Sequence, residues 1–191
     1  TEVIDESFPY DAHGWDVFKA FQLLSKSNPS LYEWAFSPIV YVDKGHFSVK
    51  LKEVIGSCYS SYSLAMHYLH LMSSNLKDLL EKQRFTKRHQ KQLIQALRAV
   101  IIINNIIDDH GIHHGPFFSL ETNSSDIYTK YYQQLVLAKK RGELEPSWKI
   151  IEIINLLLSQ KEKIEREVRT LPRGLHSIDS INEWIWELLR I

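Results

Sequence analysis

The stretch Ala99-Val-Ile-Ile-Ile-Asn-Asn-Ile-Ile107 decides the fold of this chain. It forms the second half of a helix that the pattern predicts from Thr86, a suitable cap, to Asp109, with Gly111 behind its end. Its residues are apolar on almost every side, and a helix of that kind is buried rather than amphipathic. We therefore expect this segment at the centre of a helical bundle.

Helical periodicity extends outward from this segment over most of the chain, because apolar residues recur at three- and four-residue intervals from Asp16 onward. Before the central helix we expect a first helix that stops at Ser27 and further helices over residues 30–36, 50–55 and about 60–82. After it we expect helices over about 126–141, 146–169 and 178–190. Residues 39–42 have the composition of a brief extended piece.

The resulting fold class is mostly α, a helical bundle with a short extended N-terminal arm. We divide the chain into an arm over residues 1–15, which is polar, and a helical domain over residues 16–191. The expected core contains apolar residues of the central helix and of two later helices, namely Ile101, Ile102, Ile106, Leu135, Leu156 and Leu157.

The composition limits the classes of partner. Lysine plus arginine and aspartate plus glutamate both total 23 among 191 residues, so any polyanion site must be a local patch. The single cysteine, Cys58, excludes an internal disulfide and fits a cytoplasmic protein. The longest apolar run, Ala99 to Ile103, is too short to span a bilayer. Thr1 is not an initiator methionine, so we expect the coding frame to begin upstream.

One string near the N-terminus carries a family resemblance. It reads Asp11-Ala-His-Gly-Trp-Asp-Val-Phe-Lys-Ala-Phe-Gln-Leu-Leu-Ser-Lys-Ser-Asn-Pro-Ser-Leu-Tyr-Glu-Trp34, followed by Ser37-Pro-Ile-Val-Tyr41. It resembles the segment after the catalytic strands in a family of predicted nucleotidyltransferases of the DNA polymerase β superfamily, grouped with RNA repair. The later chain is similar to the family more loosely, through His67-Tyr68, Asn75 and the run from Ala138 to Leu144.

The resemblance implies transfer of a nucleoside monophosphate from an NTP to an RNA or another hydroxyl acceptor, with Mg²⁺ as cofactor. Asp11 aligns with the third metal-binding carboxylate of the family, so the resemblance makes it the catalytic and metal-ligating candidate, and makes the arm the end of a nucleotidyltransferase core. The family's Gly-Ser turn with an Asp-x-Asp pair behind it does not occur in these residues. Asp108-Asp109 cannot replace it, because adjacent helical side chains diverge by about 100°.

The candidate substrate-binding residues are Lys26, Glu33, Lys87, Lys91 and Arg98. Lys26 lies near the Lys-Ser-Asn-Pro turn, where it could reach a phosphate, and Glu33 with Trp34 could line a nucleotide cleft. The basic stretch from Lys82 to Lys91 suits a triphosphate or an RNA backbone. A solvated helix start remains the alternative for that stretch, and packing the alternative for Trp34.

Two further groups have open interpretations. Asp16 is either a helix N-cap or part of the site. His110, His113 and His114 are either metal ligands or part of an exposed loop.

We expect the chain alone to be inactive, since one carboxylate supplies too few oxygens for a metal site. The alternative function is a non-catalytic helical module that binds a protein or nucleic-acid partner. The expected partners are NTP and RNA, with no membrane; the sequence does not indicate an oligomeric state.

Overall fold

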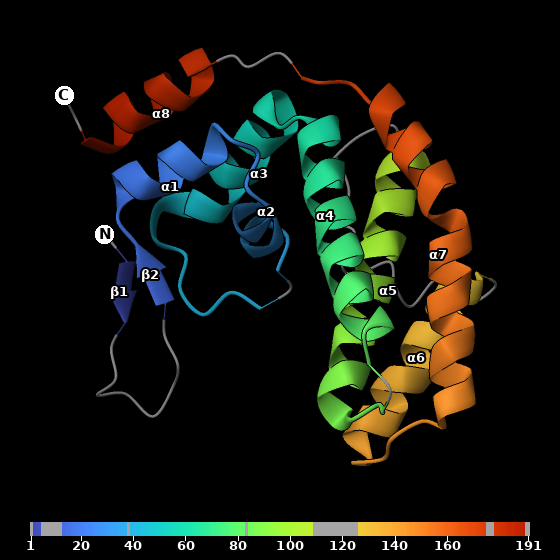
Figure 1. Cartoon of the computed structure of the whole chain (residues 1–191). Coiled ribbons are helices and arrows are strands. Elements are labelled where there is room, and N and C mark those ends of the chain that lie inside the picture. The colour runs from blue at the N-terminus through green and yellow to red at the C-terminus, as the bar shows by residue number, and fades with distance from the viewer. Residues whose placement is uncertain are drawn as a thin grey trace. The chain divides into compact units, whose positions relative to one another are not determined.

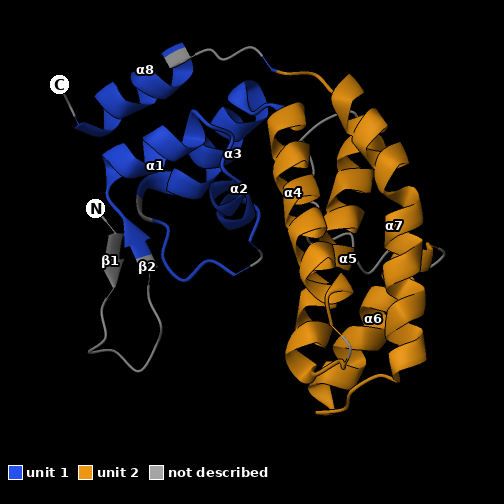
Figure 2. Cartoon of the chain, viewed as in Figure 1, with its two compact units in different colours: residues 1–60, 174–191 blue, residues 61–173 orange. Residues whose placement is uncertain are grey.

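The computed structural model describes residues 2–4, 13–37, 39–82, 84–108, 126–174 and 178–189. Most of these residues are helical, which confirms the expected mostly α class (Figure 1). The chain divides into two compact units: unit 1 comprises residues 1–60 and 174–191, and unit 2 comprises residues 61–173 (Figure 2). The expected boundary between residues 15 and 16, and the assignment of the arm to a nucleotidyltransferase core, stay predictions.

The described residues of unit 2 contain four helices, α4 (Ser61–Leu80), α5 (Lys87–Asp108), α6 (Ile127–Lys140) and α7 (Ser147–Thr170). Helix α5 contacts each of the other three (Figure 1). Its segment from 99 to 103 is buried at every position, as a helix apolar on almost every side must be. The prediction that this segment lies at the centre of a bundle is confirmed.

The core of unit 2 matches the expected residues with one exception. Five of the six are buried, namely Ile101, Ile102, Ile106, Leu135 and Leu157. Leu156 is only half-buried, so its assignment to the core was wrong. Its neighbour Leu157 takes the inward position, and adjacent residues on a helix point about 100° apart. No helix among the described residues is both long and apolar enough to cross a membrane.

Local capping residues set the helix ends in unit 2. The Thr86 Oγ1 accepts from the His89 backbone N–H at 3.5 Å, and the Thr86 N–H donates to the His89 Nδ1 at 3.2 Å. Asp126 caps α6 by accepting from the Thr129 N–H at 3.2 Å. Helix α6 ends at Lys140, and Gly142 follows it with a φ of +72°, which suits glycine. The Gly142 N–H donates to the Lys139 carbonyl, and the Glu143 N–H donates to the Ala138 carbonyl. These caps confirm the expected starts of α5 and α6 and the expected end of α6. The expected end of α5 at Asp109, with Gly111 behind it, lies outside the described residues.

Unit 1 begins with two short antiparallel strands, β1 (Glu2–Ile4) and β2 (His13–Trp15), with Val3 opposite Gly14. It continues with α1 (Val17–Leu24), α2 (Pro29–Ala35), the 3-10 turn η1 (Lys44–His46) and α3 (Phe47–Cys58). The last helix, α8 (Ile178–Leu189), returns to α1 and α3.

The buried Trp184 joins α8 to the rest of unit 1. Its ring lies 5.0 Å from that of Phe21 in α1 and 4.8 Å from that of Phe47 in α3. Aromatic pairs at such distances stabilise a core beyond their buried area.

The structure corrects two expectations for unit 1. Residues 39–42 form no strand: their side chains are exposed, and no strand among the described residues pairs with them. Helix α3 begins at Phe47 and ends at Cys58, whereas the expected helix covered only residues 50–55. The carboxylate of Asp43 accepts hydrogen bonds from the backbone and side chain of Ser48, which holds an earlier helix start. These bonds lower the pKa of Asp43 below its ordinary value.

The Lys-Ser-Asn-Pro turn is built by hydrogen bonds. Ser27 is buried at a φ of +51°, and its Oγ accepts from the backbone N–H of Ser60 at 2.9 Å. Asn28 caps α2 by accepting from the Ser30 N–H at 2.9 Å, and the Tyr59 hydroxyl donates to the Asn28 carbonyl at 2.9 Å. The turn therefore ties the start of α2 to the chain that follows α3.

Replacing Ile102 by Ala should destabilise the protein by about 2–5 kcal/mol, because the side chain is fully buried and its removal leaves a cavity. Urea unfolding followed by circular dichroism measures the change. Ile127→Ala, at a half-exposed position of α6, is the control and should cost less than about 0.5 kcal/mol. Equal effects of the two substitutions would contradict a central position for Ile102.

Replacing Ser27 by Ala should destabilise the protein by about 1–3 kcal/mol, because the buried N–H of Ser60 loses its acceptor. Serine and alanine both have a Cβ, so the substitution does not change the energetic cost of the positive φ at position 27. Lys26→Ala, one residue earlier and exposed, should change the free energy of unfolding by less than about 0.5 kcal/mol. A loss at Lys26 as large as that at Ser27 would argue against this account of the turn.

Candidate functional site

The candidate catalytic residue Asp11 lies outside the described residues, as do His110, His113 and His114. Asp16 is described, and its carboxylate caps α1 by accepting from the Lys19 N–H at 2.8 Å. The N-cap interpretation of Asp16 is therefore confirmed. The dipeptide at 56–57, which reads Gly-Ser, lies inside α3 and so is not the turn that precedes an Asp-x-Asp pair in the family.

Unit 1 holds two of the candidate binding residues, Lys26 and Glu33. Lys26 is exposed in the turn between α1 and α2, and Glu33 is half-buried on α2. Beside Glu33, the ring of Trp34 stacks on that of Trp15 from β2, with centroids 4.3 Å apart. Trp34 remains 46% exposed, so one aromatic face stays accessible while the other packs. Lys26 is thus an exposed cation, and the Trp34 ring is partly covered by its packing against Trp15.

Unit 2 holds the other three candidates, all on α5. Lys87, Lys91 and Arg98 are four and seven residues apart, so they lie within about 40° of one another around the helix axis. The first two are exposed near the N-terminus of α5, whereas Arg98 is half-buried, about 16 Å from Lys87 and about 10 Å from Lys91 along the helix. The structure thus brings Lys87 and Lys91 together and leaves Arg98 apart from them.

A second basic run joins Lys87 at this end of unit 2. A Cβ placed on Gly142, just after α6, would lie 3.9 Å from the Lys87 Nζ. The buried side chain of Gln90 fixes this arrangement: its Nε2 donates to the Glu143 carbonyl at 3.2 Å, and its Oε1 accepts from the Glu145 N–H at 2.8 Å. The turn just after α6 is therefore held against the first turn of α5.

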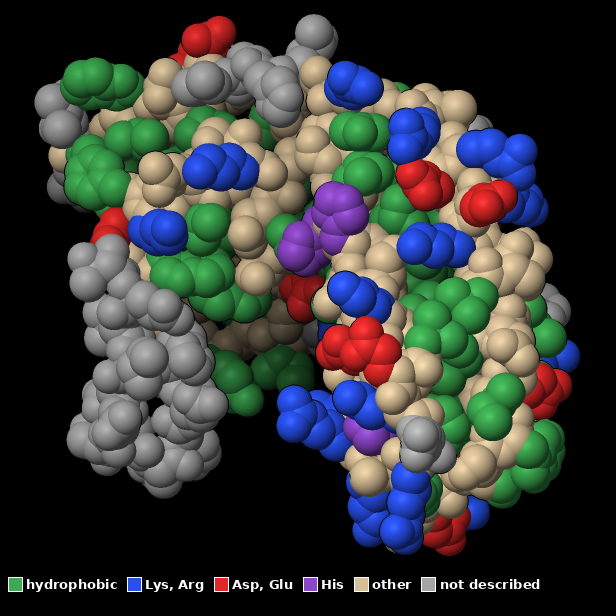
Figure 3. Space-filling model, in the orientation of Figure 1, with side chains coloured by type: hydrophobic (Ala, Val, Ile, Leu, Met, Phe, Trp, Pro, Cys, Tyr) green, Lys and Arg blue, Asp and Glu red, His purple; other side chains and the backbone are tan. Residues whose placement is uncertain are grey.

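We call this surface the basic end. It consists of eight exposed cations from the α4–α5 connection, the start of α5 and the end of α6, namely Lys82, Arg84, Lys87, Arg88, Lys91, Lys139, Lys140 and Arg141. Figure 3 shows lysine and arginine side chains gathered at the lower end of the four helices. None of the eight forms an ion pair with any residue that the structure describes. Such a surface suits a polyanion.

The sequence interpretation missed the α6 part of the basic end. Residues 139–141 belong to the run that resembles the family, and that resemblance alone does not assign them to a binding surface. Three adjacent cations before a glycine are nevertheless visible in the sequence. Two of them lie in the last turn of α6, where cations also offset the helix dipole. Nothing local indicates that this run meets Lys87.

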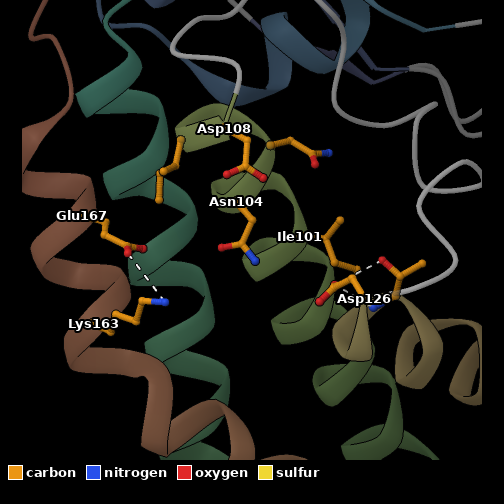
Figure 4. Close-up of a pocket in the computed structure, with 9 residues that line it drawn as sticks. Ile101, Asn104, Asp108, Asp126, Lys163 and Glu167 are labelled. Carbon is orange, nitrogen blue, oxygen red and sulfur yellow. Dashed lines mark hydrogen bonds and ion pairs between the residues drawn. The ribbon is translucent and has the colours of Figure 1, made fainter.

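Unit 2 also contains a polar pocket of about 320 Å³ away from the basic end. It is lined by parts of α5, α6 and α7, namely Ile101, Asn104, Asn105, Ile107, Asp108, Asp126, Thr129, Lys163 and Glu167 (Figure 4). The Lys163 Nζ lies 3.8 Å from the Glu167 carboxylate, and Asp126 is engaged in capping α6. Burial, and then the charges of Asp126 and Glu167, raise the pKa of Tyr128 above its ordinary value.

The acidic lining of this pocket does not make a metal site. No group of three or more His, Cys, Asp or Glu side chains that could hold a metal ion occurs among the described residues. Cys58 is also unsuited to metal binding, because burial raises the pKa of its thiol to about 11. The described part of the chain thus does not fit Mg²⁺.

Comparisons with known proteins identify the family. A family model described as "RNA repair pathway DNA polymerase beta family" matches residues 3–187. The chain is also 26% identical over 165 residues to the uncharacterized protein YcgL of Bacillus subtilis (strain 168), and this match covers 84% of the chain and 62% of YcgL. No solved structure matches the chain significantly. The family match covers nearly the whole chain, and the protein therefore belongs to the RNA repair pathway DNA polymerase β family.

Proposed function

We propose that this chain is the helical part of a Mg²⁺-dependent nucleotidyltransferase that transfers a nucleoside monophosphate from an NTP to an RNA or another hydroxyl acceptor. The observation that carries the proposal is the family match over residues 3–187. The match to YcgL spans only 62% of that protein's length, which is consistent with further functional residues outside these 191.

In the proposed reaction the acceptor hydroxyl oxygen attacks the α-phosphorus of the NTP. A new P–O bond forms, the bond to the β-phosphate oxygen breaks, and pyrophosphate leaves while the hydroxyl proton passes to a base. Magnesium supplies activation of the attacking oxygen and stabilisation of the departing charge in enzymes of this kind. We assign its ligands to Asp11 and to an Asp-x-Asp pair outside these residues, on the basis of the family alone.

The described residues contribute binding groups to this proposal. Lys26 is exposed in a turn that hydrogen bonds already hold in place. It is suited to bind a phosphate oxygen, because binding does not have to pay the entropy of ordering the turn. Glu33 lies next to the half-exposed Trp34 ring, an arrangement suited to a nucleoside. Lys87 and Lys91 supply positive charge for the polyanionic substrate, and Arg98 is assigned to the same role from its position on their face of α5.

The second candidate function is a non-catalytic helical module that binds nucleic acid or a protein. The basic end favours a nucleic acid as the partner in this alternative, since lysines and arginines bind phosphates directly. Such binding needs no catalytic carboxylate. The sequence upstream of Thr1 separates the two functions. A Gly-Ser turn with an Asp-x-Asp pair within about 100 residues, the size of a small domain, supports the enzyme. An upstream sequence without this pair removes the enzyme proposal.

The protein extended upstream through an Asp-x-Asp pair should transfer nucleotides in the presence of Mg²⁺, whereas the 191-residue chain should not. Asp11→Asn should reduce kcat by about 10²–10⁴, because the amide keeps the size but removes the charge that holds a metal or accepts a proton. Incorporation of a radiolabelled nucleotide into RNA measures the rate, and thermal unfolding checks the fold.

Asp16→Asn is the matched control, because asparagine also caps helices and keeps an oxygen that can accept from the Lys19 N–H. It should change kcat by less than about threefold, a difference below 1 kcal/mol. Loss of activity in Asp16→Asn with normal activity in Asp11→Asn would show that the third carboxylate is misaligned.

A further inference from the structure

We infer that the basic end of unit 2 is an RNA-backbone-binding surface, built jointly by the start of α5 and the end of α6. The inference rests on the proposed function in one respect, since it names RNA as the polyanion that the protein holds. It adds Lys139, Lys140 and Arg141 to the binding surface, and it assigns Gln90 the task of positioning the two basic runs.

Cations outnumber carboxylates at this surface. Residues 81–91 and 139–145 contain eight lysines and arginines but only the carboxylates of Glu81, Glu143 and Glu145. Glu145 already bonds to Lys149 at 3.2 Å. Elsewhere in unit 2, Lys163 pairs with Glu167 and Arg169 with Glu165. The basic end thus gathers eight cations without an acidic partner among the described residues, whereas α7 carries acidic partners for two of its own cations.

The extent of the surface favours RNA over a free nucleotide. Lys87 and Lys91 are about 6 Å apart along α5, and the second run extends the surface onto α6 through the contact of Lys87 with Gly142. A triphosphate offers three phosphates and would meet only part of eight cations. A nucleic-acid backbone offers one charge per nucleotide along its length and releases counterions at each contact. The N-terminus of α5 adds favourable dipole charge for phosphate.

The surface is also rigid. Both polar ends of the Gln90 amide are used on the turn after α6, and Gln90 is only 2% exposed. Gly142 closes α6 with φ of +72°, a conformation that side chains rarely adopt. The backbones that carry the two runs are therefore fixed before any ligand binds, so binding orders only side chains.

The test measures binding of the 191-residue chain to a labelled single-stranded RNA of about 20 nucleotides, longer than a typical single-strand site. Fluorescence anisotropy is recorded without NTP or Mg²⁺ at salt concentrations from about 0.05 to 0.2 M. Lys87→Glu/Lys140→Glu should weaken binding at least about 10-fold at the lowest salt. The slope of log K against log salt should become shallower by about 1.4, because each lost single-strand contact contributes about 0.7.

Lys130→Glu/Arg166→Glu is the matched control, since it changes the net charge equally at exposed positions of α6 and α7 outside the basic end. Its affinity and salt slope should stay at the wild-type values. Equal weakening by both double variants would overturn the inference, because attraction would then come from overall charge. If the glutamate variant does not fold, Lys87→Gln/Lys140→Gln should give the same change in slope, and an unchanged slope overturns the inference.

Two competitors test the class of ligand. Excess ATP at constant ionic strength should leave the RNA bound, and displacement would assign the surface to the nucleotide instead. Phosphatidylserine vesicles should not bind in preference to RNA, and preferential vesicle binding would overturn the inference. Failure of RNA binding in a protein whose extended form transfers nucleotides removes this inference alone. RNA binding through these cations without any transfer activity removes the proposed function alone.

Discussion

The burial of α5 is the constraint on which unit 2 depends. A helix that is apolar on almost every side is stable in water only when other helices cover it, and α4, α6 and α7 do so. Charged side chains are thereby excluded from residues 99–107 of α5. Its N-terminal part carries the cations of the basic end, and beyond Arg98 its polar residues are Asn104, Asn105 and Asp108, which line the polar pocket. The core thus decides where unit 2 can bind a polar ligand.

Unit 1 shows that a recurring motif need not consist of ligand-binding residues. Two of the four residues in the Lys-Ser-Asn-Pro turn hold the backbone: Ser27 accepts from the Ser60 N–H, and Asn28 caps α2. Gly174, where the chain returns to unit 1, also packs here, since a Cβ on it would lie 3.1 Å from the Ser60 Cα. The position thus requires glycine, whose φ is +74°. Lys26 is the exposed member of the turn and the one available to a substrate.

Local signals predicted the helices well, because helix starts and ends depend on nearby residues such as Asp126 and Gly142. The errors arose where a helix start depends on a side chain outside the apolar pattern, or where the pattern does not show which of two adjacent apolar residues faces inward. The hydrogen bonds of Asp43 to Ser48 lengthen α3 beyond its apolar pattern, and Leu156 faces partly outward although it is as apolar as Leu157. For the site, sequence spacing placed Lys87 and Lys91 together. The meeting of the two basic runs could not be predicted, because it depends on how α5 and α6 pack.

A net charge of zero conceals this uneven distribution of charge. Acidic residues on α7 pair with cations one turn away, as Glu165 does with Arg169 at 2.6 Å. Lys87 and Lys91 instead stand one turn apart with the same sign, an arrangement that costs about 0.2–0.5 kcal/mol in a helix. A bound polyanion removes such repulsion, so part of the binding free energy originates in the protein's own charges. Unit 2 tolerates this repulsion because its stability comes from buried apolar residues. Many of these lie in the second half of α5, away from the cations at its start.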